Sequence, residues 1–127
     1  FNVVNLLKFL SILGIFSIVD YLWLGVLAKD FNKNALGSLL SDKIKIVPTI
    51  LVYLLIASCV FFIVSKTPNA LEALKYGALF GFVVYAFYEF TNLSFVANWP
   101  IRLVIVDIIW GTFIFGFVSF IIKYLFK

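Results

Sequence analysis

Four long apolar segments, separated by short polar stretches, define the hydrophobic pattern of the chain. They run approximately over residues 6–28, 46–65, 76–97 and 101–123. Each has about 20 residues, the length that an α-helix needs to cross a hydrocarbon core of about 30 Å. Polar and apolar residues do not alternate within them, which disfavours membrane strands. The pattern predicts an all-α membrane protein, with residues 1–127 forming a single four-helix transmembrane bundle.

The composition agrees with a membrane protein. Hydrophobic residues make up 65% of the chain and charged residues 13%, whereas a soluble domain is about 45–50% apolar. The excess apolar surface must face lipid, so membrane lipid is the first expected partner. The net charge of +4 is spread over short connections, which disfavours nucleic-acid binding. With one cysteine, Cys59, and no histidine, we expect no disulfide, no thiol metal cluster and no cofactor.

The longest polar connection covers residues 29–45 and holds four lysines and two aspartates. Within it, residues 35–40 could form a short interfacial helix that ends near Ser41 and Asp42. A solvated loop and a lid over a site both remain open as interpretations. Before the third apolar segment, Asn69 followed three residues later by Glu72 predicts the start of a helix.

Three carboxylates lie inside the apolar segments: Asp20, Glu89 and Asp107. The first and third segments cross the membrane in one direction and the fourth returns. All three acids therefore fall about two helical turns below the same surface, the loop side, which carries the connection 29–45. Ionisable groups at such a depth usually face the bundle interior or a watery cavity. We expect the three acids to face one another, where burial and mutual repulsion favour the neutral form.

Polar and aromatic residues accompany these acids at helical spacing. On the third segment, Tyr85 and Asn92 share a face with Glu89. Arg102 is the nearest candidate counter-ion for an acid, and Trp99 suits an aromatic belt at the membrane surface. Aromatic rings near carboxylates could also form a cage for an organic cation. The candidate ligand-binding set comprises Asp20, Trp23, Tyr85, Tyr88, Glu89, Asn92, Arg102, Asp107 and Trp110.

Two further patterns concern packing and symmetry. Gly77 and Gly81 form a small-xxx-small pair, which favours close helix contact inside the chain or between subunits. The sequences D-x-x-W-x-G at Asp20 and D-x-x-W-G at Asp107 suggest a duplicated helical hairpin. The basic residues divide five to five between the two membrane sides, so the positive-inside rule gives no orientation. Our working interpretation places both termini in the cytoplasm. Insertion in both orientations, as an antiparallel homodimer, remains open.

A set of short motifs gives the chain a family resemblance. They are D-x-x-W-L-G at 20–25, Leu-Gly at 36–37, Val-Pro at 47–48, G-A-L-F-G-F-x-x-Y-A-x-Y at 77–88, an acid-x-T-N-L run at 89–93, W-P-x-R at 99–102 and D-x-x-W-G at 107–111. In combination they resemble the small bacterial membrane family catalogued as domain of unknown function 2177. The resemblance covers nearly the whole chain. It implies a multi-pass protein of the bacterial inner membrane with four spans, and it implies no activity. One position departs from the pattern, because Glu89 stands where the family motif has Asp.

Three functions remain open on the sequence. The first, our best interpretation, is a carrier or permeation unit for a cation or protons, bound by Asp20, Glu89 and Asp107. The second is an intramembrane enzyme that isomerises a lipid or isoprenoid by carboxylate acid/base chemistry. The third is a structural or accessory subunit whose acids hold helices together. As a side hypothesis, the three carboxylates with Thr91 and Asn92 could hold Mg²⁺ or Ca²⁺.

Overall fold

The computed structural model describes residues 1–41 and 43–127, which form helices joined by short connections and no strand. Four of the helical elements are long and apolar enough to cross a membrane. The predicted fold class, an all-α membrane bundle with four spanning helices, is confirmed. In chain order the elements are α1 (Val3–Leu22), continued by a π-helical segment (Trp23–Leu27), α2 (Lys29–Leu36), a 3₁₀ turn (Gly37–Leu39), α3 (Ile46–Lys66), α4 (Ala70–Phe95) and α5 (Ile101–Leu125).

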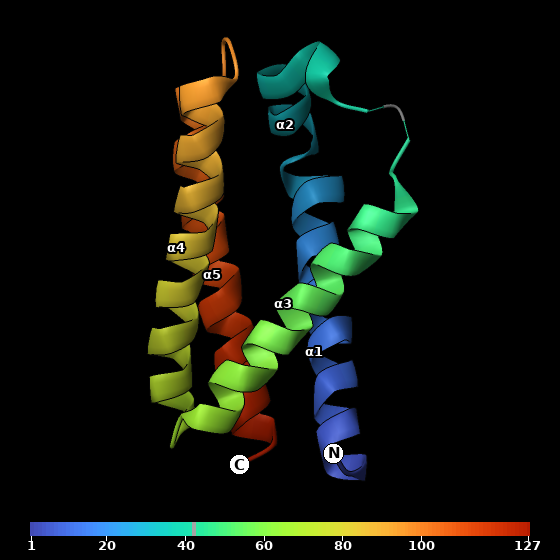
Figure 1. The fold of residues 1–127 in the computed structure, drawn as a ribbon, viewed down its shortest axis with the longest axis vertical. Coiled ribbons are helices and arrows are strands. Elements are labelled where there is room, and N and C mark those ends of the chain that lie inside the picture. Colours follow the sequence, from blue (N-terminus) through green and yellow to red (C-terminus); the bar gives the residue numbers. More distant parts are fainter. Residues whose placement is uncertain (42) are drawn as a thin grey trace.

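The long helices group around α5, which contacts α1, α3 and α4. Helices α4 and α5 lie side by side as an antiparallel hairpin, and α1 stands on the other side of α5 (Figure 1). Helix α3 crosses the bundle obliquely: its end lies near the start of α4, and its beginning lies far from α4 (Figure 1). Both termini lie at one end of the bundle, while α2 and the α4–α5 turn lie at the other, the loop side (Figure 1).

The hydrophobic core lies where α1, α3 and α5 meet. Phe16 of α1 and Phe115 of α5 are both almost fully buried, with ring centroids 5.2 Å apart. Most other large apolar side chains of the spanning helices are exposed. This distribution suits helices that present one face to each other and the rest to lipid.

The α4–α5 hairpin is closely packed because glycines remove side chains from its interface. A Cβ atom on Gly77 would lie 2.5 Å from the carbonyl oxygen of Phe115, and one on Gly81 would overlap the carbonyl oxygen of Gly111. The small-xxx-small prediction is confirmed, and the contact lies within the chain. The two backbones therefore approach closely enough for polar side chains on α4 and α5 to meet.

The predicted helix start at Asn69 is also confirmed. The Asn69 side chain accepts a 2.9 Å hydrogen bond from the backbone N–H of Glu72, and α4 begins at Ala70. At the other end of α4, the turn into α5 includes Asn98, whose φ of 61° lies in the left-handed region that asparagine tolerates. Pro100 then precedes the first residue of α5, where a missing N–H is harmless.

The connection after the first span differs from the expectation. A helix covers Lys29–Leu36, whereas residues 37–39 form only a 3₁₀ turn, so the predicted helix over 35–40 is wrong. Asp30 in the first turn and Lys33 in the last complement the helix dipole. Gly37, with φ of +53°, then ends the helix. Of the predicted end near Ser41 and Asp42, Asp42 lies outside the described residues.

Candidate functional site

Glu89 is the most deeply buried carboxylate of the chain that the structure describes, with 0% of its surface exposed. It lies on α4, near the loop side. Its Oε1 accepts a 2.8 Å hydrogen bond from the indole Nε1 of Trp99, in the α4–α5 turn. Its Oε2 is buried and has no N–H or hydroxyl donor among the described residues. One oxygen of the buried group is therefore satisfied, and the other has no hydrogen-bond partner in the described part of the chain.

Asp107 on α5 lies within electrostatic range of Glu89 on α4. Two negative charges this close, in a site with little water, repel each other, so a proton on one of the two carboxyl groups favours the arrangement. We refer to Glu89 and Asp107 as the carboxyl pair. Its geometry follows from the hairpin, because the α4–α5 contact at Gly81 and Gly111 brings the acid-bearing faces together.

Asp20 occupies a separate position between three helices. It is 7% exposed. Its Oδ2 accepts a 2.5 Å hydrogen bond from the Tyr53 hydroxyl of α3, and its Oδ1 accepts a 3.2 Å bond from Nε1 of Trp110 on α5. Both carboxyl oxygens are therefore satisfied by neutral donors. Asp20 lies within electrostatic range of Asp107, but its hydrogen bonds tie α1 to α3 and α5.

Tyr85 lies near both Asp20 and the carboxyl pair. Its hydroxyl lies within electrostatic range of Asp20 and of Asp107. The ring packs edge-on against Phe115, with centroids 6.3 Å apart, and it occupies the space that a side chain at Gly111 would need. The glycine of the D-x-x-W-G motif thus makes room for the tyrosine beside the acids.

The two tryptophans of the D-x-x-W motifs contact each other. The rings of Trp23 and Trp110 are stacked, with centroids 4.6 Å apart and planes 8° from parallel. Trp110 also lies beside Phe113, with ring centroids 5.6 Å apart. The indole Nε1 of Trp23 is buried and has no partner among the described residues. These two indoles stack on one another instead of surrounding an open space between them.

The other predicted site residues lie around this centre. Tyr88 is exposed and packs edge-to-face on Trp99, with centroids 6.4 Å apart. Asn92 is half-buried and lies one helical turn from Tyr88 along α4. Arg102 is exposed, and its guanidinium lies 6.0 Å from the ring centroid of Phe31 on α2.

The predicted pairing of Arg102 with an acid is therefore not found within the described residues. There, the recorded ion pair joins Lys75 and Glu72, 3.8 Å apart on the surface of α4. The hypothesis of a divalent cation held by all three acids also fails within this part of the chain, where no group of three acidic, cysteine or histidine side chains could hold a metal ion. The reason is geometric, because Asp20 is bonded to Tyr53 and Trp110 instead of joining the carboxyl pair.

Two residues at this centre were missing from the predicted site. They are Tyr53, which the sequence pattern does not single out, and Trp99, for which it predicts only a place in the aromatic belt. The signal for Tyr53 is its depth, because it lies about two turns into α3 from the loop side, level with the acids. Trp99 precedes α5 directly and is ten residues from Glu89, a separation that a tight helical hairpin brings together.

The fold and this centre define a polytopic α-helical membrane protein with two acids, the buried Glu89 and the half-buried Asp107, on neighbouring spans. A family model described as a predicted membrane protein, domain of unknown function 2177 (DUF2177), matches residues 5–124. The chain belongs to this family, as the motifs of the sequence indicate. Searches of curated proteins and of solved structures returned no significant match.

Proposed function

We propose that the protein is a small proton-linked cation carrier and that Glu89 and Asp107 bind the proton. The observation that carries the proposal is the fully buried Glu89, one of whose carboxyl oxygens has no hydrogen-bond partner within the described residues. A buried acid on a spanning helix is expensive and is generally retained for a function. No basic side chain forms an ion pair with Glu89 or Asp107 within residues 1–41 and 43–127. A proton is the cation best suited to a buried carboxyl group of this kind.

The pair can exchange that proton for another cation. When one proton is shared, the pair carries a single negative charge, and loss of the proton leaves two like charges side by side. A cation that enters next to the pair relieves this repulsion, so proton release and cation binding favour each other. The rings of Tyr88 and Trp99 lie on the same side of α4 as Glu89 and supply faces that attract organic cations. In keeping with the family resemblance, we place this carrier in a bacterial inner membrane.

A structural role is a second proposal, limited to Asp20. Its support is the set of hydrogen bonds from Tyr53 and Trp110, which join α1 to α3 and α5. In this account Asp20 holds the helices that surround the carboxyl pair and does not itself bind the transported ion. The roles of Asp20 and Asp107 can therefore be separated by mutation.

Proteoliposomes that contain a pH-sensitive dye test the carrier. External Na⁺ and, separately, the aromatic cation ethidium are added, and release of protons from the lumen is recorded. Glu89→Gln and Asp107→Asn should abolish cation-dependent proton release, because a side-chain amide does not take up and release a proton near neutral pH. Glu72→Gln, which changes a surface acid of the same helix, should leave release intact. Release that persists in both pair variants would contradict the carrier.

A further inference from the structure

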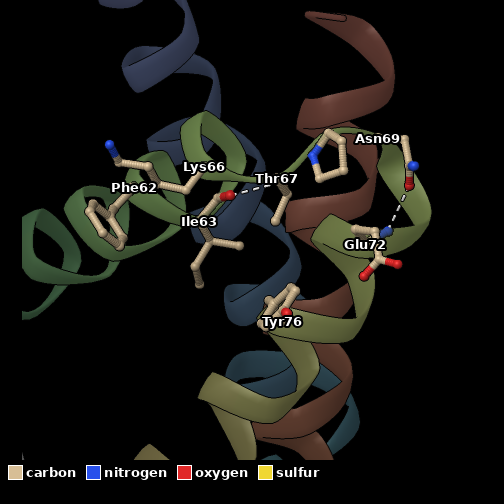
Figure 2. A pocket seen from close by; sticks show the side chains of 8 residues that line it. Phe62, Ile63, Lys66, Thr67, Asn69, Glu72 and Tyr76 are labelled. Carbon is tan, nitrogen blue, oxygen red and sulfur yellow. Dashed lines mark hydrogen bonds between the residues drawn. The ribbon is translucent and has the colours of Figure 1, made fainter.

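Three neighbouring hollows lie between α3 and α4. The first, of about 520 Å³, is at the α3–α4 turn (Figure 2). A second hollow of about 520 Å³ shares Phe62 and Tyr76 with the first. A third, of about 490 Å³, shares Cys59 and Phe80 with the second. The three hollows therefore follow one another along the two helices, and we refer to them together as the α3–α4 groove.

The middle of the groove suits a hydrocarbon chain. Its walls are apolar side chains such as Leu55 and Leu79, which are 66% and 59% exposed. Both flanking helices are membrane spans, so this exposed surface faces lipid and not water. Along α3 the groove extends from Lys66 to Val52, or about 21 Å at 1.5 Å per residue. An acyl chain that crosses one leaflet needs about 15 Å, half of the hydrocarbon core.

The mouth of the groove carries one charge of each sign. Figure 2 shows Lys66 at the end of α3 and Glu72 at the start of α4, on opposite sides of the hollow. The Lys66 ammonium lies 5.8 Å from the ring centroid of Phe62. The Glu72 carboxylate forms an ion pair with Lys75, 3.8 Å away on the surface of α4. A headgroup that binds Lys66 and Glu72 must therefore compete with these two surface contacts, which are weak.

We propose that the α3–α4 groove binds one zwitterionic phospholipid whose headgroup carries a primary ammonium. Lys66 binds the phosphate, Glu72 accepts hydrogen bonds from the ammonium, and an acyl chain lies along Cys59 and Phe80. The charge pattern selects this headgroup: a trimethylated amine cannot donate to Glu72, and an anionic glycerol headgroup brings no cation to it. The inner end of the groove is lined by Tyr85 and Tyr88, which lie near the acids, whereas the proposed headgroup contacts lie at Lys66 and Glu72. Variants of Lys66 and Glu72 therefore test the lipid site apart from the proposed transport.

The test reconstitutes the full chain in bilayers of equal parts phosphatidylethanolamine, phosphatidylcholine and phosphatidylglycerol with the same acyl chains. After detergent extraction, native mass spectrometry counts the lipids that stay bound. The expected result is one phosphatidylethanolamine per chain. Lys66→Gln should lower its retention about tenfold, the equivalent of one charge-assisted contact. Lys127→Gln is the control, because Lys127 lies on the same membrane side over Tyr124 and does not line the groove.

Two further variants separate the headgroup from the chain. Glu72→Gln should keep a bound lipid but lose the preference for phosphatidylethanolamine over phosphatidylcholine. Cys59→Trp should fill the middle of the groove and remove the lipid, whereas Ile18→Trp, at an exposed position of α1, should not. Retention of several lipids in the proportions of the bilayer, or equal retention in Lys66→Gln and Lys127→Gln, would overturn the proposal. Melting curves of each variant show that it is folded.

Discussion

The indole Nε1 of Trp99 donates a 2.8 Å hydrogen bond to Oε1 of Glu89. The donor lies in the turn between α4 and α5, and the acceptor lies two turns inside α4. Trp99 therefore does more than mark the membrane surface, because it also satisfies half of a fully buried carboxyl group. The bond leaves Oε2 as the oxygen of Glu89 without a hydrogen-bond partner in the described residues.

Replacing Trp99 by phenylalanine removes this donor and keeps an aromatic ring. We expect Trp99→Phe to lower the free energy of unfolding by about 1–3 kcal/mol, because a buried acceptor loses its partner. Thermal melting in detergent measures the change. Trp23→Phe is the matched control, since Nε1 of Trp23 has no partner in the described part of the chain. Equal losses in the two variants would show that the Trp99–Glu89 bond contributes nothing specific.

The hydroxyl of Tyr53 offers a second test, of the contact between α1 and α3. Tyr53→Phe removes the donor to Asp20 and should destabilise the bundle by about 1–3 kcal/mol, again through an unsatisfied buried group. Tyr21→Phe changes an exposed hydroxyl on α1 and should have little effect. Unfolding in increasing concentrations of a denaturing detergent compares the stabilities of the two variants. A harmless Tyr53→Phe would argue against Asp20 as a structural tie.

The hairpin packing predicts opposite effects for two glycines. A Cβ on Gly81 would overlap the Gly111 carbonyl, so Gly81→Ala should force α4 and α5 apart and destabilise the protein by about 1–3 kcal/mol. Gly14 on α1 has nothing within 4 Å of an added Cβ. Gly14→Ala should therefore stabilise the helix slightly, by up to about 1 kcal/mol. Melting temperatures that move in the same direction for both variants would contradict the packing.

Arg102 should be dispensable for the proposed transport. Its guanidinium lies over Phe31, and in the described residues it has no carboxylate within ion-pair distance. Arg102→Gln should therefore leave cation-dependent proton release in proteoliposomes unchanged. If Arg102→Gln abolished release as Asp107→Asn is expected to do, the arginine would have to act in the transport cycle.

The fold could be predicted from the sequence because lipid allows few solutions. Apolar runs of spanning length must become helices, and antiparallel crossing places Asp20, Glu89 and Asp107 at one depth. Periodicity along one helix does not reveal which acids meet, since that depends on how neighbouring helices rotate and tilt. The sequence pattern predicts one cluster of three acids, whereas the structure bonds Glu89 to Trp99 and Asp20 to Tyr53 and Trp110.

The same physical reason explains why the sequence pattern does not reveal the role of Tyr53 or the stacking of the two tryptophans. Tyr53 lies alone in an otherwise apolar span, and its role depends on the oblique crossing of α3 over α1, which hydropathy does not encode (Figure 1). The stacking of Trp23 on Trp110 likewise results from the contact between α1 and α5. By contrast, Asn69 and Gly81 were interpreted correctly, because capping and close packing depend on local sequence.

Infrared difference spectroscopy of the reconstituted protein tests most directly whether Glu89 and Asp107 share one proton, as we propose. The wild type should show a protonated-carboxyl band at neutral pH. Glu89→Gln and Asp107→Asn should each remove that band, because the new amide can donate to the remaining carboxylate without a proton. Glu72→Gln should leave it in place. A band that survives in both pair variants, or is absent from the wild type, would contradict the shared proton.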